Sequence, residues 1–187
     1  MYIVKVMKIH LLTKNEGKLK AARSTFDKYE IELLPVDKEY PEIQAESSLE
    51  IARHSAVQAV RDLNSPVIRE DHSLFIEALG IPGPYMNYVE KKISADKILE
   101  IIDFLGNRNG WFEVSTVYAE PSGKTFEHTF KVPMTFGTES KGDNPRGWNG
   151  LIRLDEETRA ITEYPEEERL HIWNEGYEAV VKYLTQG

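Results

Sequence analysis

Two short segments carry the residues best suited to chemistry, and the first is a polar turn at residues 13–18. It follows an apolar run at residues 2–12 and precedes a segment with helical apolar spacing. Free amides at a helix N-terminus attract anions, and Thr13, Asn15 and Lys18 would add hydrogen bonds and charge around a phosphate. The turn is not a Walker loop, since no G-x-x-x-x-G-K followed by Ser or Thr occurs. Alone, its composition also suits an ordinary helix cap with solvated charges.

The second segment is the acidic pair Glu70 and Asp71, expected at the junction between a strand that starts at Pro66 and a loop. Glu42 lies at the end of another predicted element, so three carboxylates are candidates for one site. Such hard oxygen ligands suit Mg²⁺, which would bridge triphosphate oxygens and offset charge during phosphoryl or nucleotidyl transfer. In isolation, an acidic pair after a strand is more often a solvated turn than a metal site.

The elements that must position these residues alternate between strand and helix in the first half of the chain. Ser47 and Glu50 form a capping-box pattern for a helix that runs to about Leu63, and Ser94 is a second N-cap. Two aromatic and β-branched runs around the turn at residues 121–124 then predict a hairpin. The predicted strands are residues 2–12, 31–35, 66–71, 111–119, 125–136 and 151–154, and helices are predicted after residues 18, 47, 94 and about 166. This order predicts an α/β fold in a single domain over residues 1–187.

Composition limits the classes of partner. The chain has 187 residues, 41% of them apolar, which suffices for one sizeable core. A net charge of −8 opposes non-specific contact with nucleic acids or anionic membranes. The absence of cysteine excludes disulfides and thiolate chemistry. Lys5 and Lys8 interrupt the N-terminal apolar run, which favours a soluble cytoplasmic protein over a secreted or membrane-anchored one.

The order of the motifs resembles one known family. The motifs are Thr13-x-Asn15-x-x-Lys18, Tyr40-Pro41-Glu42-Ile43-Gln44, Glu70-Asp71 before Leu74-Phe75-Ile76, and Pro82-Gly83-Pro84-Tyr85. In this order the chain resembles the inosine triphosphate pyrophosphatase family, also called the Ham1 or non-standard purine NTP pyrophosphatase family, especially its archaeal form. The resemblance is close over about residues 8–105, weaker through the hairpin, and patchy from about residue 137.

The resemblance implies a two-lobed fold with an elongated mixed sheet, flanking helices and a central cleft, often as a homodimer. It implies an enzyme in which, with Mg²⁺ present, water attacks the α-phosphorus of ITP, XTP or their deoxy forms and releases pyrophosphate and a nucleoside monophosphate. Carried over by position, Thr13, Asn15 and Lys18 would hold the triphosphate, and Glu42 and Glu70 would help to bind the metal. Asp71 would bind metal or activate water, which makes Asp71 and Lys18 the predicted catalytic residues.

The chain departs from the family pattern at two turns. The family has Asp-Ser-Gly where this chain has Asp71-His72-Ser73, which removes a flexible glycine and adds an imidazole. His72 suits either an exposed turn or a contact with the substrate. The family's Phe-Gly-Trp/Tyr-Asp element is Arg146-Gly147-Trp148-Asn149 here, so an amide replaces the carboxylate that reads the base. Trp148 and Asn149 are predicted substrate contacts, with a core position for Trp148 as the alternative.

A third departure lies in the last helical region, where the family's Ser-His-Arg tripeptide is missing. The resemblance places Arg169 where the family has a lysine and His171 near the place of its histidine, so it implies that both contact the nucleotide. The phosphate and metal half of the site is thus intact beside an altered base half. We expect a Mg²⁺-dependent pyrophosphatase with shifted base specificity, and the alternative is a catalytically weak nucleotide-binding protein on the same fold. A nucleic-acid-binding module has no supporting motif.

Overall fold

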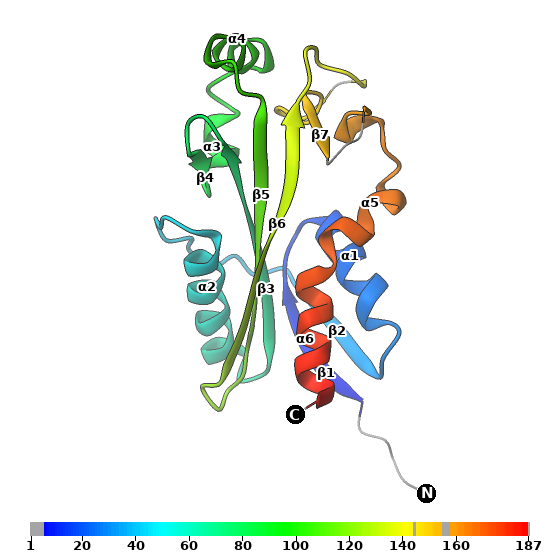
Figure 1. Ribbon diagram of the computed structural model, residues 1–187. Coiled ribbons are helices and arrows are strands. Elements are labelled where there is room, and N and C mark those ends of the chain that lie inside the picture. Colours follow the sequence, from blue (N-terminus) through cyan, green and yellow to red (C-terminus); the bar gives the residue numbers. More distant parts are fainter. Residues whose placement is uncertain (1–5, 144, 155–157, 187) are drawn as a thin grey trace, which may run out of the picture.

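The computed structural model describes residues 6–143, 145–154 and 158–186, and it shows an elongated molecule built on one long mixed sheet (Figure 1). The strands are β1 (Met7–Leu12), β2 (Ile31–Val36), β3 (Val67–Ile76), β4 (Ile81–Gly83), β5 (Asn109–Ala119), β6 (Thr125–Phe136) and β7 (Ile152–Leu154). The helices are α1 (Glu16–Phe26), α2 (Ser48–Leu63), α3 (Met86–Val89), α4 (Ala95–Leu105), α5 (Glu166–Trp173) and α6 (Glu175–Gln186), with a 3₁₀ turn η1 (Ile161–Glu163).

The sheet has the strand order β2-β1-β3-β5-β6-β7, and β4 pairs with β3 outside this path. β1 is parallel to β2 and β3, whereas the β3–β5, β5–β6, β6–β7 and β3–β4 pairs are antiparallel. The β5–β6 hairpin runs through the whole molecule. It carries α1, α2 and α6 around one end and α3, α4, β4 and β7 around the other, so the molecule has two lobes (Figure 1). The predicted fold class, a mixed α/β sheet flanked by helices, is confirmed.

Each lobe has its own apolar core. In the lobe of α1, α2 and α6, one sheet face is covered by α2 through small residues such as Ala52, Ala56 and Ala59, all fully buried. Alanines at this spacing form one helix stripe and let the helix approach the sheet closely. Helices α1 and α6 pack together and, through Phe26 and Tyr177, against the same sheet in a second cluster. The other lobe has a larger core between the sheet and α4.

The strand that carries the acidic pair differs from the prediction. Glu70 and Asp71 were expected at a strand-to-loop junction, but they lie in the middle of β3, which continues to Ile76. The strand continues because β5 pairs with all ten of its residues. On its other edge, β1 pairs only as far as Ile68, and the pairing with β4 starts at Leu74, which lies opposite Gly83 at the end of β4. Within the described part of the chain, residues 69–73 therefore have one strand edge without a sheet partner, and this edge faces the candidate site.

The remaining elements follow the sequence pattern with two adjustments. Strand β1 begins at Met7, and residues 2–5 of the predicted strand lie outside the described part of the chain. The predicted C-terminal helix is two helices, because α5 ends at Trp173 and α6 starts at Glu175. The predicted hairpin and the helices capped by Ser47 and Ser94 are confirmed. None of the helices in the described ranges combines the length and apolar character needed to span a membrane.

Candidate active site

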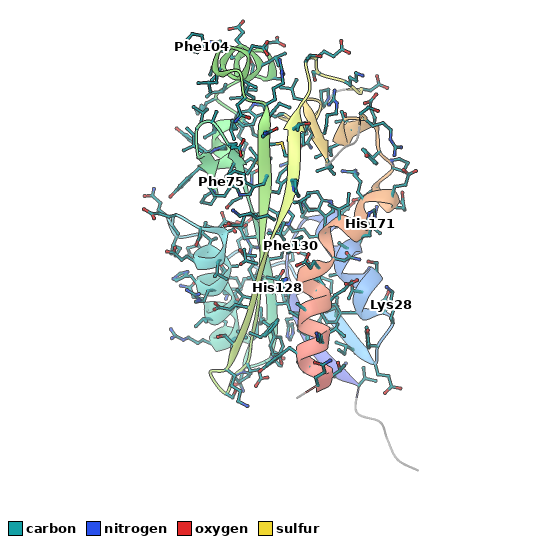
Figure 2. All side chains as sticks on the ribbon, in the orientation of Figure 1. Lys28, Phe75, Phe104, His128, Phe130 and His171 are labelled. Carbon is teal, nitrogen blue, oxygen red and sulfur yellow. The ribbon has the colours of Figure 1, made fainter. Side chains whose placement is uncertain are left out.

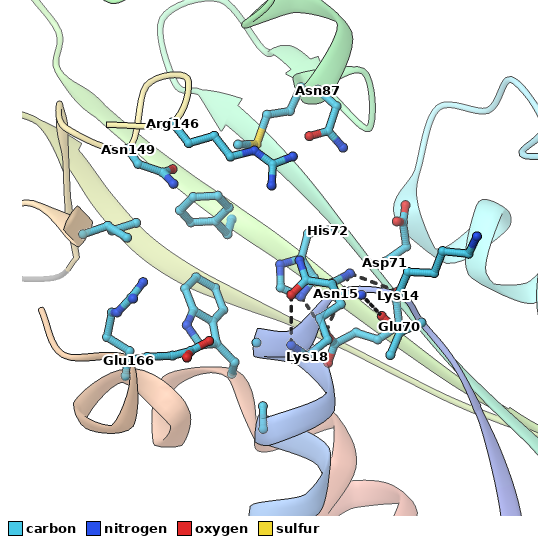
Figure 3. Close-up of a pocket in the computed structure, with 18 of the residues that line it drawn as sticks. Lys14, Asn15, Lys18, Glu70, Asp71, His72, Asn87, Arg146, Asn149 and Glu166 are labelled. Atoms are coloured by element: carbon cyan, nitrogen blue, oxygen red, sulfur yellow. Dashed lines mark hydrogen bonds and ion pairs between the residues drawn. The ribbon is translucent and has the colours of Figure 1, made fainter. Parts of the chain in front are cut away.

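A pocket of about 450 Å³ lies between the two lobes, beside the unpaired edge of β3 (Figure 3). Its walls come from the β1–α1 turn, β3, α3, the loop before β7, and α5. Most of the residues predicted to act on a nucleotide line this one pocket: Thr13, Asn15, Lys18, Glu42, Glu70, Asp71, Asn149 and Arg169. Segments separated by more than a hundred positions in the sequence are thus brought to one site.

The turn at residues 13–18 is stabilised by hydrogen bonds to its own side chains. The amide of Asn15 donates to Thr13 Oγ1 at 3.1 Å, and the amide of Lys18 donates to Asn15 Oδ1 at 3.2 Å. Asn15 is therefore the N-cap of α1, and the turn is a helix cap as well as a pocket wall. The positive end of the α1 dipole and the Lys18 ammonium face the pocket from the same side, an arrangement that favours a bound anion.

The side chain of Lys18 extends from α1 to β3. Its Nζ donates to the Glu70 carbonyl oxygen at 3.1 Å and lies 3.9 Å from Glu70 Oε1 (Figure 3). Burial lowers the pKa of Lys18, and the negative charges of Glu70 and Asp71 oppose that shift. A cation that is only partly compensated in a shielded position attracts a further anion strongly.

The buried Glu70 pairs with the partly buried His72. Glu70 is 3% exposed, and its Oε1 lies 2.8 Å from His72 Nε2. The imidazole stacks on the indole of Trp173, with ring centroids 5.4 Å apart, and Phe112 meets that indole edge-on. Burial lowers the pKa of His72, which favours the neutral ring. The expectation of an exposed turn for His72 is wrong, because β3 continues through this position and directs the ring into the pocket wall.

Asp71 and Glu42 border the same pocket and share Arg69. The Arg69 guanidinium donates from Nη2 to Glu42 Oε1 at 2.9 Å, from Nη1 to the Leu12 carbonyl at 3.2 Å, and lies 3.9 Å from Asp71 Oδ1. Burial raises the pKa of Asp71, although Lys18 and Arg69 oppose the shift. Arg69 is thus a pocket residue that the sequence motifs did not identify. The signal in the sequence that could have identified Arg69 is its place directly before the acidic pair Glu70 and Asp71.

The donor set fits Mg²⁺ only with help from a substrate. Among the residues that the structure describes, no three His, Asp or Glu side chains gather closely enough to hold an ion. The Glu70 carboxylate is instead turned to His72 and Lys18. Asp71 and Glu42 remain as oxygen donors at the pocket. Mg²⁺ is commonly held by one or two carboxylates together with substrate phosphates, and this set suits that mode.

Two of the predicted base contacts lie outside the pocket. Trp148 is 1% exposed in the core, where its Nε1 donates to the Ile93 carbonyl at 2.9 Å, so its assignment as a substrate contact is wrong. His171 is exposed on the outer side of α5 (Figure 2) and is also wrongly assigned. Helical geometry explains this: Arg169 and Trp173 are four residues apart and share the pocket face, whereas a residue two positions from each points elsewhere.

The end of the pocket away from Lys18 combines polar and apolar side chains. Arg146 and Asn149 lie on the loop before β7, and Asn87 approaches from α3 (Figure 3). Apolar lining comes from Met86, Phe112, Ile161, Leu170 and Trp173. Such a mixture of flat apolar surface and amide groups suits a heterocyclic base. Phe112 belongs to the aromatic run of the predicted hairpin, and its ring is buried in β5 beside the pocket.

The fold and the pocket together define an α/β protein whose cleft has Lys18 and the N-terminus of α1 at one end and amide and aromatic side chains at the other. The sequence profile of the Ham1 family matches residues 9–181, and the chain belongs to that family. Two proteins named dITP/XTP pyrophosphatase are similar to it. That of Methanopyrus kandleri is 35% identical over 167 residues, 89% of each chain. That of Thermococcus kodakarensis is 31% identical over 171 residues, covering 91% of this chain and 92% of the relative.

Solved structures show the same fold. The HAM1 protein of Coxiella burnetii superimposes with a TM-score of 0.81 at 20% identity, over 97% of this chain and 100% of that one. The Ham1 protein of Staphylococcus aureus gives a TM-score of 0.77 at 19% identity, over 96% and 98% of the two chains. The family resemblance recognised from the motif order is therefore confirmed.

Proposed function

We propose that this protein is a nucleoside-triphosphate pyrophosphatase that hydrolyses non-standard purine nucleoside triphosphates to the monophosphate and pyrophosphate. The observation that carries the proposal is the convergence of Thr13, Asn15, Lys18 and Asp71 on one pocket. The names of the archaeal relatives, dITP/XTP pyrophosphatases, support the same reaction and substrate class.

The residues of the pocket have separate tasks in this proposal. The triphosphate would lie against the α1 N-terminus, where Lys18 and the free amides offset its charge. Asp71, desolvated but still open to the pocket, would orient or deprotonate the attacking water, or bind the metal. Mg²⁺, held by Asp71 and Glu42 with the phosphates, would supply charge neutralisation at the scissile anhydride. Glu70 would hold Lys18 in place.

We further propose that base selection differs from that of the relatives. The base end of the pocket presents the Asn149 amide and the Arg146 guanidinium. An amide both donates and accepts, and a guanidinium stacks on a base or donates to its edge. Arg169 would reach the nucleotide from α5. Homodimer formation and a cytoplasmic location stay predictions from the family resemblance.

The test is pyrophosphate release from ITP, XTP, dITP, GTP, ATP and dUTP, each with Mg²⁺ and with EDTA, for the wild type and Asp71→Asn. We expect metal-dependent release that is fastest for a non-standard purine and falls at least about 100-fold in the variant. Nucleotide binding without release from any triphosphate would favour a catalytically weak nucleotide-binding protein. The contact of Glu70 Oε1 with His72 Nε2, which occupies an oxygen of a predicted metal ligand, is the observation that favours this second candidate.

A further inference from the structure

The guanidinium of Arg153, on β7, is buried among backbone carbonyls. The residue is 6% exposed, and no carboxylate pairs with it among the described residues. Its Nη1 donates to the Gly150 carbonyl at 2.8 Å, and its Nη2 donates to the Glu139 carbonyl at 3.2 Å. A buried charge is costly unless its donors are satisfied, so these carbonyls are what stabilise the cation here.

The carbonyls belong to both ends of the loop between β6 and β7, which presents Arg146 and Asn149 to the pocket. The guanidinium therefore joins the outgoing and the returning chain of this loop. Backbone bonds reinforce the same closure: the Gly137 amide donates to the Leu151 carbonyl at 2.7 Å, and the Lys141 amide donates to the Gly150 carbonyl at 3.0 Å.

The sequence leaves room for this arrangement at Gly137. A Cβ atom added to Gly137 would lie 2.8 Å from Arg153 Nη2 and 2.9 Å from Cζ, closer than real contacts allow. A side chain at residue 137 would therefore displace the guanidinium from the loop. Lysine could not replace the arginine fully, because one ammonium lacks the planar fork that reaches two carbonyls in different directions.

We propose that Arg153 is a positioning residue that holds the β6–β7 loop closed, so that Arg146 and Asn149 face the nucleobase end of the pocket. The proposal deepens the proposed function and rests on it. Arg153 does not line the pocket itself, so it acts through the loop. The phosphate end, built by the α1 turn and β3, is independent of this loop.

The experiment compares the affinities for ITP and for inorganic tripolyphosphate, in EDTA, across the wild type, Arg153→Met and Arg153→Lys. Tripolyphosphate has no base, so it reports the phosphate end alone. We expect Arg153→Met to weaken ITP binding between about 10-fold and 100-fold and to leave tripolyphosphate binding within about twofold. Arg153→Lys should fold normally and lose ITP affinity to a smaller extent. Amide hydrogen exchange at Gly137 and Lys141 should become faster in both variants.

Arg53→Met is the matched control, because Arg53 pairs with Glu127 on the surface of α2 and β6 at 2.5 Å. It should change neither affinity. An unchanged ratio of ITP to tripolyphosphate affinity in Arg153→Lys, despite faster loop exchange, would overturn the positioning role. Equal wild-type affinities for the two ligands would also overturn it, since no base contact would then exist. Failure of the proposed function is seen separately, as the absence of pyrophosphate release from a wild type that still prefers ITP. If Arg153→Met does not fold, the ratio of ITP to tripolyphosphate affinity in Arg153→Lys alone tests the positioning role.

Discussion

Replacement of Lys18 by methionine separates charge from side-chain length at the phosphate end of the pocket. The Lys18 side chain is 18% exposed, and its Nζ has one carbonyl partner at 3.1 Å and the Glu70 carboxylate at 3.9 Å. A hydrogen bond to a charged group contributes about 1.5–3 kcal/mol. If Lys18 binds the triphosphate, Lys18→Met should therefore weaken tripolyphosphate binding by roughly 10-fold to 150-fold.

The same replacement has a second, independent effect on stability. The Glu70 side chain is 2% exposed and would lose its neighbouring cation, while it keeps the contact with His72. Loss of a partner from a buried charged group lowers the free energy of unfolding, here by about 1–3 kcal/mol. Calorimetric titration with tripolyphosphate measures the first effect, and urea unfolding measures the second.

The control is Lys8→Met, since Lys8 is 60% exposed in a surface pair with Glu32 at 3.0 Å. It should change tripolyphosphate affinity by less than about twofold, because surface ion pairs contribute little. A folded Lys18→Met protein that binds tripolyphosphate as tightly as the wild type would refute the assignment of residues 13–18 to phosphate binding. Lys18 would then serve only to neutralise Glu70.

The other predictions concern the cap and the two corrected assignments. Asn15→Ala should lower the free energy of unfolding by about 1 kcal/mol through loss of the α1 cap, measured by urea unfolding. Trp148→Phe should lower the free energy of unfolding by about 1 kcal/mol, because the Ile93 carbonyl loses its indole donor. The ratio of ITP to GTP turnover should stay unchanged, and a changed ratio would show that Trp148 does influence base selection. His171→Ala should alter the unfolding free energy by less than about 0.5 kcal/mol and leave nucleotide affinity as it was, which an affinity loss would contradict.

Much of the fold could be predicted because local patterns agree with tertiary packing. The capped helices and the long hairpin have strong periodic signals and end at Ser, Gly or turn residues. The path of β3 could not be predicted in this way. Glu70, Asp71 and His72 interrupt its apolar pattern, and only the pairing with β5 keeps these residues in an extended strand. A long-range pairing leaves no local mark in a sequence.

The residues of the candidate site also differ in how far local sequence could predict their positions. Thr13, Asn15 and Lys18 are close in sequence, so their shared location on a cap follows from spacing alone. Trp173 could not be recognised as a pocket residue, because its position depends on how α5 packs beside β3. Trp148 and His171 were assigned by alignment position. Neither the direction of an indole in a loop nor the face of a short helix follows from the identity of one residue.

The most direct test of the central claim is the fate of water oxygen during turnover. The proposed reaction places the attack of water at the α-phosphorus. Attack at the β-phosphorus would release the same monophosphate and pyrophosphate but would put the water oxygen in the pyrophosphate. When dITP or XTP is hydrolysed in ¹⁸O-labelled water with Mg²⁺, mass spectrometry should find one label in the nucleoside monophosphate and none in the pyrophosphate. Label in pyrophosphate, or release of inorganic phosphate from the γ-position, would contradict the account.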